Sequence, residues 1–388
     1  METPSFLPSP TSLIAACCRW PLSDQDDELI TSEIAKIGDW DALLESAMQH
    51  RVLVQVLEVL DGRSGVPTAF LDRLKLTALQ CRKLGLQQLA ELQRLDNLLS
   101  SHKICYAELK GMTLGELAYG RTDLKVSIDI DLFVAEGDVQ QAVSLLLANG
   151  YRHNKAGTQI SARQIKALMH SRKDLPLSGP DGLQLELHWR LSQATSLLKG
   201  IGEPTGWQDV TLPNGIQIKT LSKPDLVAFL AVHGALSDWE RLKWLADLNA
   251  LIAKSSVEEI RGFLAHADKA GAGKTLRFAF VLCRDLLGRE QLLGLDDLDC
   301  DPSLLEAGAA SIHAGYTPKS NAFGDRARLL RANLRNHSQL FNSVFGRREI
   351  VRPFIFVEAD LLAFPLPRAL RYLYPLIRIP HWLFTRNH

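Results

Sequence analysis

The sequence lacks the features that mark a disulfide-rich, membrane-spanning or nucleic-acid-coating protein. Its 388 residues include only six cysteines, and none of them forms the Cys-x-x-Cys pairs of a zinc finger. The formal net charge is zero, which argues against nucleic-acid binding through a globally basic surface. Charged residues and prolines interrupt every apolar run before it could cross a bilayer, and no signal-peptide pattern precedes them. We therefore expect a cytoplasmic protein with reduced cysteines and no transmembrane segment.

What the sequence does contain is the composition of a folded protein and a change of hydrophobic period along the chain. Hydrophobic residues make up 46% and charged residues 23% of the total. Apolar positions recur every three or four residues over 27–60 and 67–101, as in amphipathic helices, and this period returns near the carboxyl end. We predict an N-terminal helical region (1–81), a mixed α/β core (82–215) and a C-terminal helical domain (216–388).

Two aspartates stand inside the segment SIDIDLFV, which otherwise has the pattern of a buried strand. Side chains alternate between the faces of a strand, so Asp129 and Asp131 share one face. The other face, with Ile128, Ile130 and Leu132, is expected to point into a core. Burying a carboxylate is costly without a cation, and two carboxylates at this spacing can hold Mg²⁺ or Mn²⁺ together with nucleotide phosphates. A solvated strand face is the alternative for such a pair taken alone.

The segment LQLELHW, residues 183–189, repeats this alternation further along the chain. Its leucines lie on one face, and Glu186 and His188 lie on the other. If the two strands are neighbours, Glu186 adds a third carboxylate, and three such acids are the ligand set of a two-metal phosphoryl or nucleotidyl transfer site. His188 has two interpretations: it orients a metal ligand, or it is a structural histidine beside Trp189.

A Lys-Gly pair lies between a predicted strand and a short predicted helix. Gly111 can let backbone N–H groups approach a phosphate at the start of that helix, and Lys110 adds positive charge. Many ordinary strand-to-helix turns also contain glycine, so this pair by itself decides nothing.

These segments together resemble the uncharacterised nucleotidyltransferase family of bacteria, a branch of the DNA polymerase β-like nucleotidyltransferase superfamily. The family pattern is a Lys-Gly turn, a short helix, an Arg-x-Ser-x-Asp-Ile-Asp-Leu strand and a strand ending in Leu-His-Trp. Here LKG occupies 109–111, KVSIDIDLFV occupies 125–134 and LELHWRL occupies 185–191, and the resemblance covers about residues 10–260. It implies an α/β (α+β) fold: a polymerase β-like nucleotidyltransferase core with a mixed sheet, flanked by N-terminal and C-terminal helical regions.

The resemblance also implies roles for individual residues. Asp129, Asp131 and Glu186 correspond to the superfamily's metal-binding carboxylates. Lys110 and Gly111 correspond to its nucleotide-phosphate turn. The implied cofactor is Mg²⁺ or Mn²⁺, and the implied substrate is a nucleoside triphosphate.

The sequence departs from the superfamily at two positions. Met112 follows Gly111 where Gly or Ser is usual, so a serine contact to phosphate is absent. Lys125 stands where the family commonly has Arg, which keeps the charge but loses the bidentate fork. Both departures concern the binding of phosphate, and neither removes a metal ligand.

The predicted helical segment HGALSDWERLKWLADL carries polar residues among apolar ones. Lys243 and Asp247 are four positions apart, which fits a helix-surface ion pair. The alternative, implied by similar enzymes, is that Lys243 reaches the triphosphate from the helical domain. His233 is a further polar residue of this segment. The apolar residues at helical spacing are expected to form core: Trp239, Leu242, Leu245 and Leu248.

The segment AGAGKT, residues 270–275, has an incomplete phosphate-loop pattern. Asp268 occupies the position where that pattern requires its first glycine, and the preceding segment is helical rather than a strand. We therefore interpret it as a break between helices.

The carboxyl end is locally basic. Residues 326–388 contain eleven arginines, no lysine and three acids. A solvated face that covers the core is one interpretation. An acidic partner, an anionic substrate or a peripheral contact with a membrane surface would each fit as well.

Our first hypothesis is an Mg²⁺-dependent nucleotidyltransferase that moves a nucleoside monophosphate from an NTP to a small-molecule, sugar or peptide acceptor and releases pyrophosphate. Asp129 and Asp131 would hold metal, Glu186 would complete the site or act as general base, and Lys110 would bind phosphate. The alternative is a non-catalytic nucleotide-binding or partner-binding module that kept the fold. Nucleic acid is the disfavoured acceptor, because the net charge is zero and no RNA-binding motif is present.

Overall fold

The computed structural model of the protein describes most of the chain. The described residues are 7–295 except 155 and 158, then 298, 301–315, 356–367, 370, 373, 374 and 376. The Arg-rich stretch 323–335 lies outside them, and so does most of 367–382, so the predicted role of this end stays a prediction.

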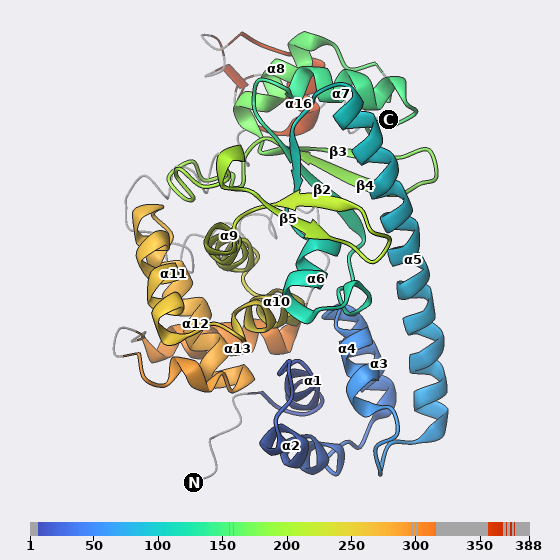
Figure 1. Ribbon diagram of the computed structural model, residues 1–388, viewed down its shortest axis with the longest axis vertical. Helices are drawn as coiled ribbons and strands as arrows, with labels where there is room; N and C mark the ends of the chain where they lie inside the picture. The colour runs from blue at the N-terminus through green and yellow to red at the C-terminus, as the bar shows by residue number, and fades with distance from the viewer. Residues whose placement is uncertain are drawn as a thin grey trace.

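Within the described residues, five helices precede the sheet, in the region predicted to be helical. They are α1 (Thr11–Cys17), α2 (Asp24–Ile34), α3 (Trp40–Gln49), α4 (Leu53–Leu60) and α5 (Thr68–Ser101). The Asp39 carboxylate caps α3 by accepting from the N–H groups of Asp41 and Ala42. Helix α5 runs along one side of the molecule, from the N-terminal helices to the sheet (Figure 1). It passes residue 81 without a break, and the domain boundary predicted there stays a prediction.

A four-stranded mixed sheet forms the centre of the chain. Its strands are β1 (Tyr106–Glu108), β2 (Asp129–Val134), β3 (Asp174–Ser178) and β4 (Gln184–His188). The order is β1-β2-β4-β3, with β2 and β4 parallel and the two outer strands antiparallel to their neighbours. In the parallel pair Asp131 lies opposite Glu186. The strands predicted to carry the carboxylates are therefore neighbours.

The chain between these strands forms helices. Helix α6 (Met112–Tyr119) follows β1, while α7 (Val139–Ala148) and α8 (Ala162–Ser171) follow β2. A separate hairpin of β5 (Gln208–Thr211) and β6 (Gln217–Thr220) follows β4. The Thr220 hydroxyl donates to the carbonyl of Glu108 at 2.6 Å, which ties the hairpin to β1.

The sheet separates two hydrophobic cores, as strand alternation requires. Ile130 and Leu132 pack in one core with α5, α7 and α8, and Phe133 belongs to the other, with α6 and the C-terminal helices. Ile128 corrects the sequence prediction: β2 begins at Asp129, and Ile128 is 44% exposed rather than part of the core. The face that carries the aspartates therefore looks toward the C-terminal helices.

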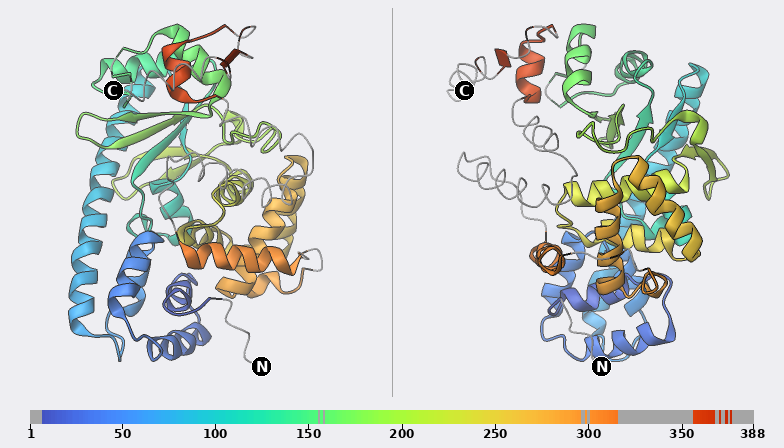
Figure 2. Two further views of the ribbon diagram at one scale, coloured as in Figure 1. Left: turned by 180° about the vertical axis from the view of Figure 1, so that it is seen from behind. Right: turned by 90° about the vertical axis from the view of Figure 1, so that its left-hand side faces the viewer.

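The C-terminal helices pack against the N-terminal ones. They are α9 (Lys223–Leu236), α10 (Leu242–Ile252), α11 (Val257–Lys269), α12 (Gly273–Leu287) and α13 (Pro302–Ala314). Figure 2 shows them beside α1 to α4 in both views, and buried residues of both sets form one core. The predicted helix break at AGAGKT is confirmed between α11 and α12. Helix α16 (Glu358–Ala363) packs against α8.

Trp239, predicted to be core, is fully buried in the turn between α9 and α10. A Cβ on Gly234 would lie 2.2 Å from its ring, so glycine is what lets the indole reach the helix backbone. Among the helices in the described part of the chain, none combines the length and the apolar composition that a bilayer span needs.

Candidate active site

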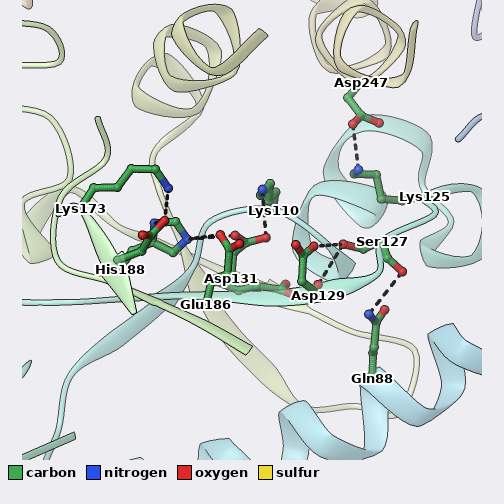
Figure 3. A network of polar contacts seen from close by, with 12 residues as sticks. Gln88, Lys110, Lys125, Ser127, Asp129, Asp131, Lys173, Glu186, His188 and Asp247 are labelled. Atoms are coloured by element: carbon green, nitrogen blue, oxygen red, sulfur yellow. Dashed lines mark hydrogen bonds and ion pairs between the residues drawn. The ribbon is translucent and has the colours of Figure 1, made fainter. Parts of the chain in front are cut away.

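Three side chains from the parallel strands converge on the face of the sheet that looks toward the C-terminal helices. Asp131 comes from β2, and Glu186 and His188 come from β4. Each offers a ligand atom within 4.8 Å of the others. Figure 3 shows the three groups pointing toward one another, with Lys110 and Lys173 around them. Two carboxylates and an imidazole in this arrangement are a donor set for a divalent cation.

Asp131 is the most enclosed member of this group. Its side chain is fully buried; His188 Nε2 lies 2.9 Å from Oδ1, and Lys110 Nζ lies 3.2 Å from Oδ2. Burial opposes the charged carboxylate, but Lys110 and His188 outweigh burial and hold the pKa of Asp131 well below its usual range. Oδ2 nevertheless receives no well-directed hydrogen bond, so a buried carboxylate oxygen keeps a lone pair for a ligand.

His188 lies between the two carboxylates. Its Nε2 is 2.9 Å from Asp131 and 3.2 Å from Glu186, and its Nδ1 is 3.9 Å from Asp174. Burial and Lys173 act against the charged ring, yet the hydrogen bonds to Asp131 and Glu186 prevail and raise the pKa of His188. The imidazole therefore sits where it can neutralise both carboxylates.

Asp129 lies on the same face but in a different environment. It is half-buried, and its Oδ1 accepts from the Ser127 hydroxyl at 3.2 Å. Gln88 on α5 donates to the Ser127 carbonyl at 3.3 Å and holds the start of β2. Among the described residues, the group of ligand atoms within 4.8 Å of one another does not include Asp129. Its predicted role as a metal ligand stays a prediction.

The Lys-Gly turn has a backbone conformation that favours glycine, and the N–H donors at the start of α6 are already engaged. Gly111 has φ 100°, and a Cβ there would lie 2.6 Å from Oε1 of Glu108. The Glu108 carboxylate accepts from the N–H groups of Met112 at 3.2 Å and Thr113 at 2.8 Å. Burial raises the pKa of Glu108 to about 7, against the pull of these donors. A phosphate bound at this helix start would have to displace Glu108.

Lys125 and Asp247 form a buried ion pair, which corrects the surface pair expected between Lys243 and Asp247. Lys125 Nζ lies 2.9 Å from Asp247 Oδ2, and the Tyr119 hydroxyl donates to Oδ1 at 3.0 Å. Asp247 and Lys243 are both buried, because neighbouring helices enclose α10 and every one of its residues is buried. Lys125 thus fastens the segment before β2 to α10.

Lys243 is a buried amine with no ion pair among the residues that the structure describes. Burial, with Lys125 and Lys110 close by, lowers the pKa of Lys243 well below its ordinary value. His233 on α9 shows the same effect, since burial and Lys110 lower its pKa well below the usual range. The helical side of the site therefore holds two buried basic groups whose charged forms are disfavoured by burial and by neighbouring lysines.

Several residues of this site have a larger part in the structure than the sequence indicates. For His188 the sequence indicates a supporting or structural role, yet the residue belongs to the converging group, and its Nε2 lies close to both Asp131 and Glu186. Lys173 and Asp174, at the start of β3, were not singled out, although they flank His188. The feature that could identify Asp174 is that it is an acidic residue within a strand, and this strand pairs with the LELHW strand. Glu108 has the same feature, since it is an acidic residue in the predicted strand before the Lys-Gly turn.

The fold and this cluster define a class of protein, a mixed α/β nucleotidyltransferase domain with helical additions on both sides. The profile of the family described as uncharacterised nucleotidyltransferase matches residues 37–288, more than half of the chain. The chain belongs to this family, and both the predicted resemblance and the predicted fold class are confirmed. A search among curated proteins found no match.

Proposed function

We propose that this protein is a metal-dependent nucleotidyltransferase that transfers a nucleoside monophosphate from an NTP to an acceptor and releases pyrophosphate. The observation that carries the proposal is the convergence of Asp131, Glu186 and His188 on adjacent parallel strands. Family membership supports the reaction class. Electropositive groups beside the cluster support an anionic substrate.

The residues present fit a divalent cation. The buried Oδ2 of Asp131 lacks a well-directed donor, and the surrounding set is two carboxylates and one imidazole. Asp131, Glu186 and His188 would hold the ion, with Asp129 as the further ligand that the family resemblance implies. When bound, such an ion supplies Lewis-acid stabilisation of phosphate charge.

The side chains themselves divide the remaining work. Lys110, already paired with Asp131, would turn toward the β and γ phosphates, and Lys243 would gain the anionic partner that its buried amine lacks. The acceptor hydroxyl oxygen would bond to the α-phosphorus while the bond to the β-phosphate oxygen breaks and pyrophosphate leaves. The hydroxyl proton would pass to Glu186, whose side chain is 33% exposed and the most accessible of the three.

The test is NTP binding by calorimetry and pyrophosphate release, each with Mg²⁺ and with Mn²⁺. The variants are Asp129→Asn and Glu186→Gln, since both side chains are partly exposed and tolerate substitution better than the buried Asp131. Asp209→Asn, in the exposed hairpin, is the matched control. We expect metal-dependent binding in the wild type and control, and loss of turnover in both site variants.

If no nucleotide binds the wild type with either metal, the proposal is wrong. Binding without turnover under any acceptor would favour the non-catalytic nucleotide-binding module instead. The observation that favours this second function is that Glu108 already accepts from an N–H group that a phosphate would need.

A further inference from the structure

A cavity of about 430 Å³ lies beside the proposed active site. It begins at Phe133, which shares a sheet face with Asp131 and follows it by two residues, about 7 Å along the strand. Its far wall is built from the chain that follows β4, starting one residue after His188. It therefore lies at the carboxyl end of the parallel pair, where open α/β sheets place their ligands.

The floor of this cavity is apolar. Its side chains are almost completely buried, and they come from β2 and from the segment after β4: Phe133, Leu191, Leu197, Leu198 and Ile201. Gly202 completes the floor with φ 90°, and a Cβ there would lie 3.1 Å from Leu191 and 3.3 Å from Phe133. Glycine at this position lets the chain approach Leu191 and Phe133 closely, and an apolar body fits the space that these residues line.

The mouth carries charges of both signs. Arg190 is already engaged, since it donates to Glu136 at 3.0 Å and to the Met169 carbonyl at 2.8 Å. Lys199 and Glu203 also line the mouth, are exposed, and form no ion pair within the described part of the chain. One ammonium and one carboxylate are thus left available at the rim of an apolar space.

We infer that this cavity binds the acceptor, and that the acceptor is a short apolar peptide with free termini. The inference rests on the proposed function, which requires an acceptor, and on the residues that line the cavity, which indicate the chemistry of that acceptor. The apolar floor takes aliphatic or aromatic side chains, Lys199 takes the peptide carboxylate, and Glu203 takes the peptide ammonium.

A sugar fits this cavity poorly. Hydroxyl groups set against Phe133 and the leucines of the floor would find no donor or acceptor in those side chains, and each unsatisfied hydroxyl would cost binding energy. Ser192 and Thr195 are the uncharged hydroxyl side chains of the lining. A nucleic-acid acceptor would need cations for its phosphates, but the mouth balances Arg190 and Lys199 with Glu136 and Glu203. A zwitterion with an apolar body matches both the floor and the rim.

The experiment measures binding of a tripeptide set by calorimetry. The probes have a central serine, whose hydroxyl is the candidate nucleophile, flanked by Leu, Ile, Val or Phe. Each is tested with free termini, with an acetylated amino end and with an amidated carboxyl end. The variants are Lys199→Glu and Glu203→Lys, and the matched controls are Lys254→Glu and Glu258→Lys, which are exposed charges away from the cavity.

We expect free tripeptides to bind the wild type and both controls. Lys199→Glu should weaken the free peptide about three- to tenfold and leave the amidated peptide unchanged. Glu203→Lys should do the same for the free peptide and leave the acetylated peptide unchanged. NTP binding is measured on all five proteins and should not change.

The inference is overturned if no tripeptide of the set binds the wild type at about 1 mM. It is also overturned if each variant affects free and blocked peptides equally, or if the controls behave like the cavity variants. The proposed function has a separate readout. If the wild type binds peptide but no NTP, the nucleotidyltransferase proposal is wrong and the peptide site stands. If it binds NTP but no peptide, the proposed function stands and the peptide site is wrong.

Discussion

The imidazole Nε2 of His188 lies 2.9 Å from Oδ1 of Asp131, although 57 residues separate them in the chain. The parallel pairing of β2 and β4 makes this contact, because it places Phe133 opposite His188 and Asp131 opposite Glu186. A nitrogen donor therefore joins a set that the sequence presented as carboxylates.

His188→Gln should weaken Mn²⁺ binding more than Mg²⁺ binding. Imidazole suits transition ions, whereas Mg²⁺ prefers oxygen ligands, so the loss should be at least about tenfold for Mn²⁺ and smaller for Mg²⁺. Calorimetry with each ion measures the ratio, and electron paramagnetic resonance of bound Mn²⁺ reports nitrogen coupling. Equal losses for the two ions would rule out a nitrogen ligand.

The two aspartates of β2 should differ in their effect on stability. Asp131→Asn removes a fully buried anion that pairs with Lys110, whose side chain is 12% exposed, and should lower the free energy of unfolding by about 3–5 kcal/mol. Asp129→Asn alters one partly exposed hydrogen bond and should cost about 1 kcal/mol or less. Urea unfolding of both variants gives the comparison, and similar losses would contradict the difference in burial.

The pair of Lys125 and Asp247 should behave as one buried unit. Lys125→Met leaves Asp247 buried without its cation and should cost about 3–5 kcal/mol. The double variant Lys125→Met, Asp247→Asn should cost less than the sum of the two single changes, because Asn still accepts from Tyr119 and no charge remains unpaired. Additive losses in urea unfolding would show that the two residues do not interact.

Glu108 should make folding depend on pH. Burial raises its pKa to about 7, so above the ordinary carboxyl pKa the folded protein keeps a proton that the unfolded chain has released. Its contribution to stability should therefore fall as pH rises through this window, by up to about 3 kcal/mol.

Glu108→Gln removes that titration while still offering an oxygen to the N–H of Thr113. Urea unfolding of the wild type and the variant at about pH 5 and about pH 8 isolates the effect as a difference between the two slopes. The free energy of unfolding of the variant, relative to that of the wild type, should be higher at about pH 8 than at about pH 5. A constant difference between them would mean that Glu108 is ionised throughout.

Lys243→Met should raise stability and lower nucleotide affinity. Burial lowers the pKa of Lys243, so keeping an amine there costs folding energy at every pH below its ordinary value, and Met removes that cost. The temperature of thermal unfolding without ligand should rise. Calorimetry should show weaker NTP binding if the Lys243 amine contacts the triphosphate. A variant that is less stable would mean that Lys243 has a structural partner.

The sequence by itself determined the local elements and which residues share a face. Period-two alternation placed Asp129 with Asp131 and Glu186 with His188, and helical periods found α5 and the C-terminal helices. These features are local, since they follow from strand and helix geometry and from capping residues such as Asp39. Ile128 shows the limit, because the point where a strand begins depends on its neighbours.

Only the tertiary structure decided which charged groups meet. Asp247 forms its ion pair with Lys125 and not with Lys243. The Glu108 carboxylate accepts from an N–H group of the Lys-Gly turn, and His188 belongs to the group of candidate metal ligands. Each outcome depends on burial, because a charge removed from water must find the nearest group that compensates it, whatever its distance in sequence. Periodicity specifies the face on which a side chain lies, and the packing of the sheet against α9 and α10 specifies what it faces.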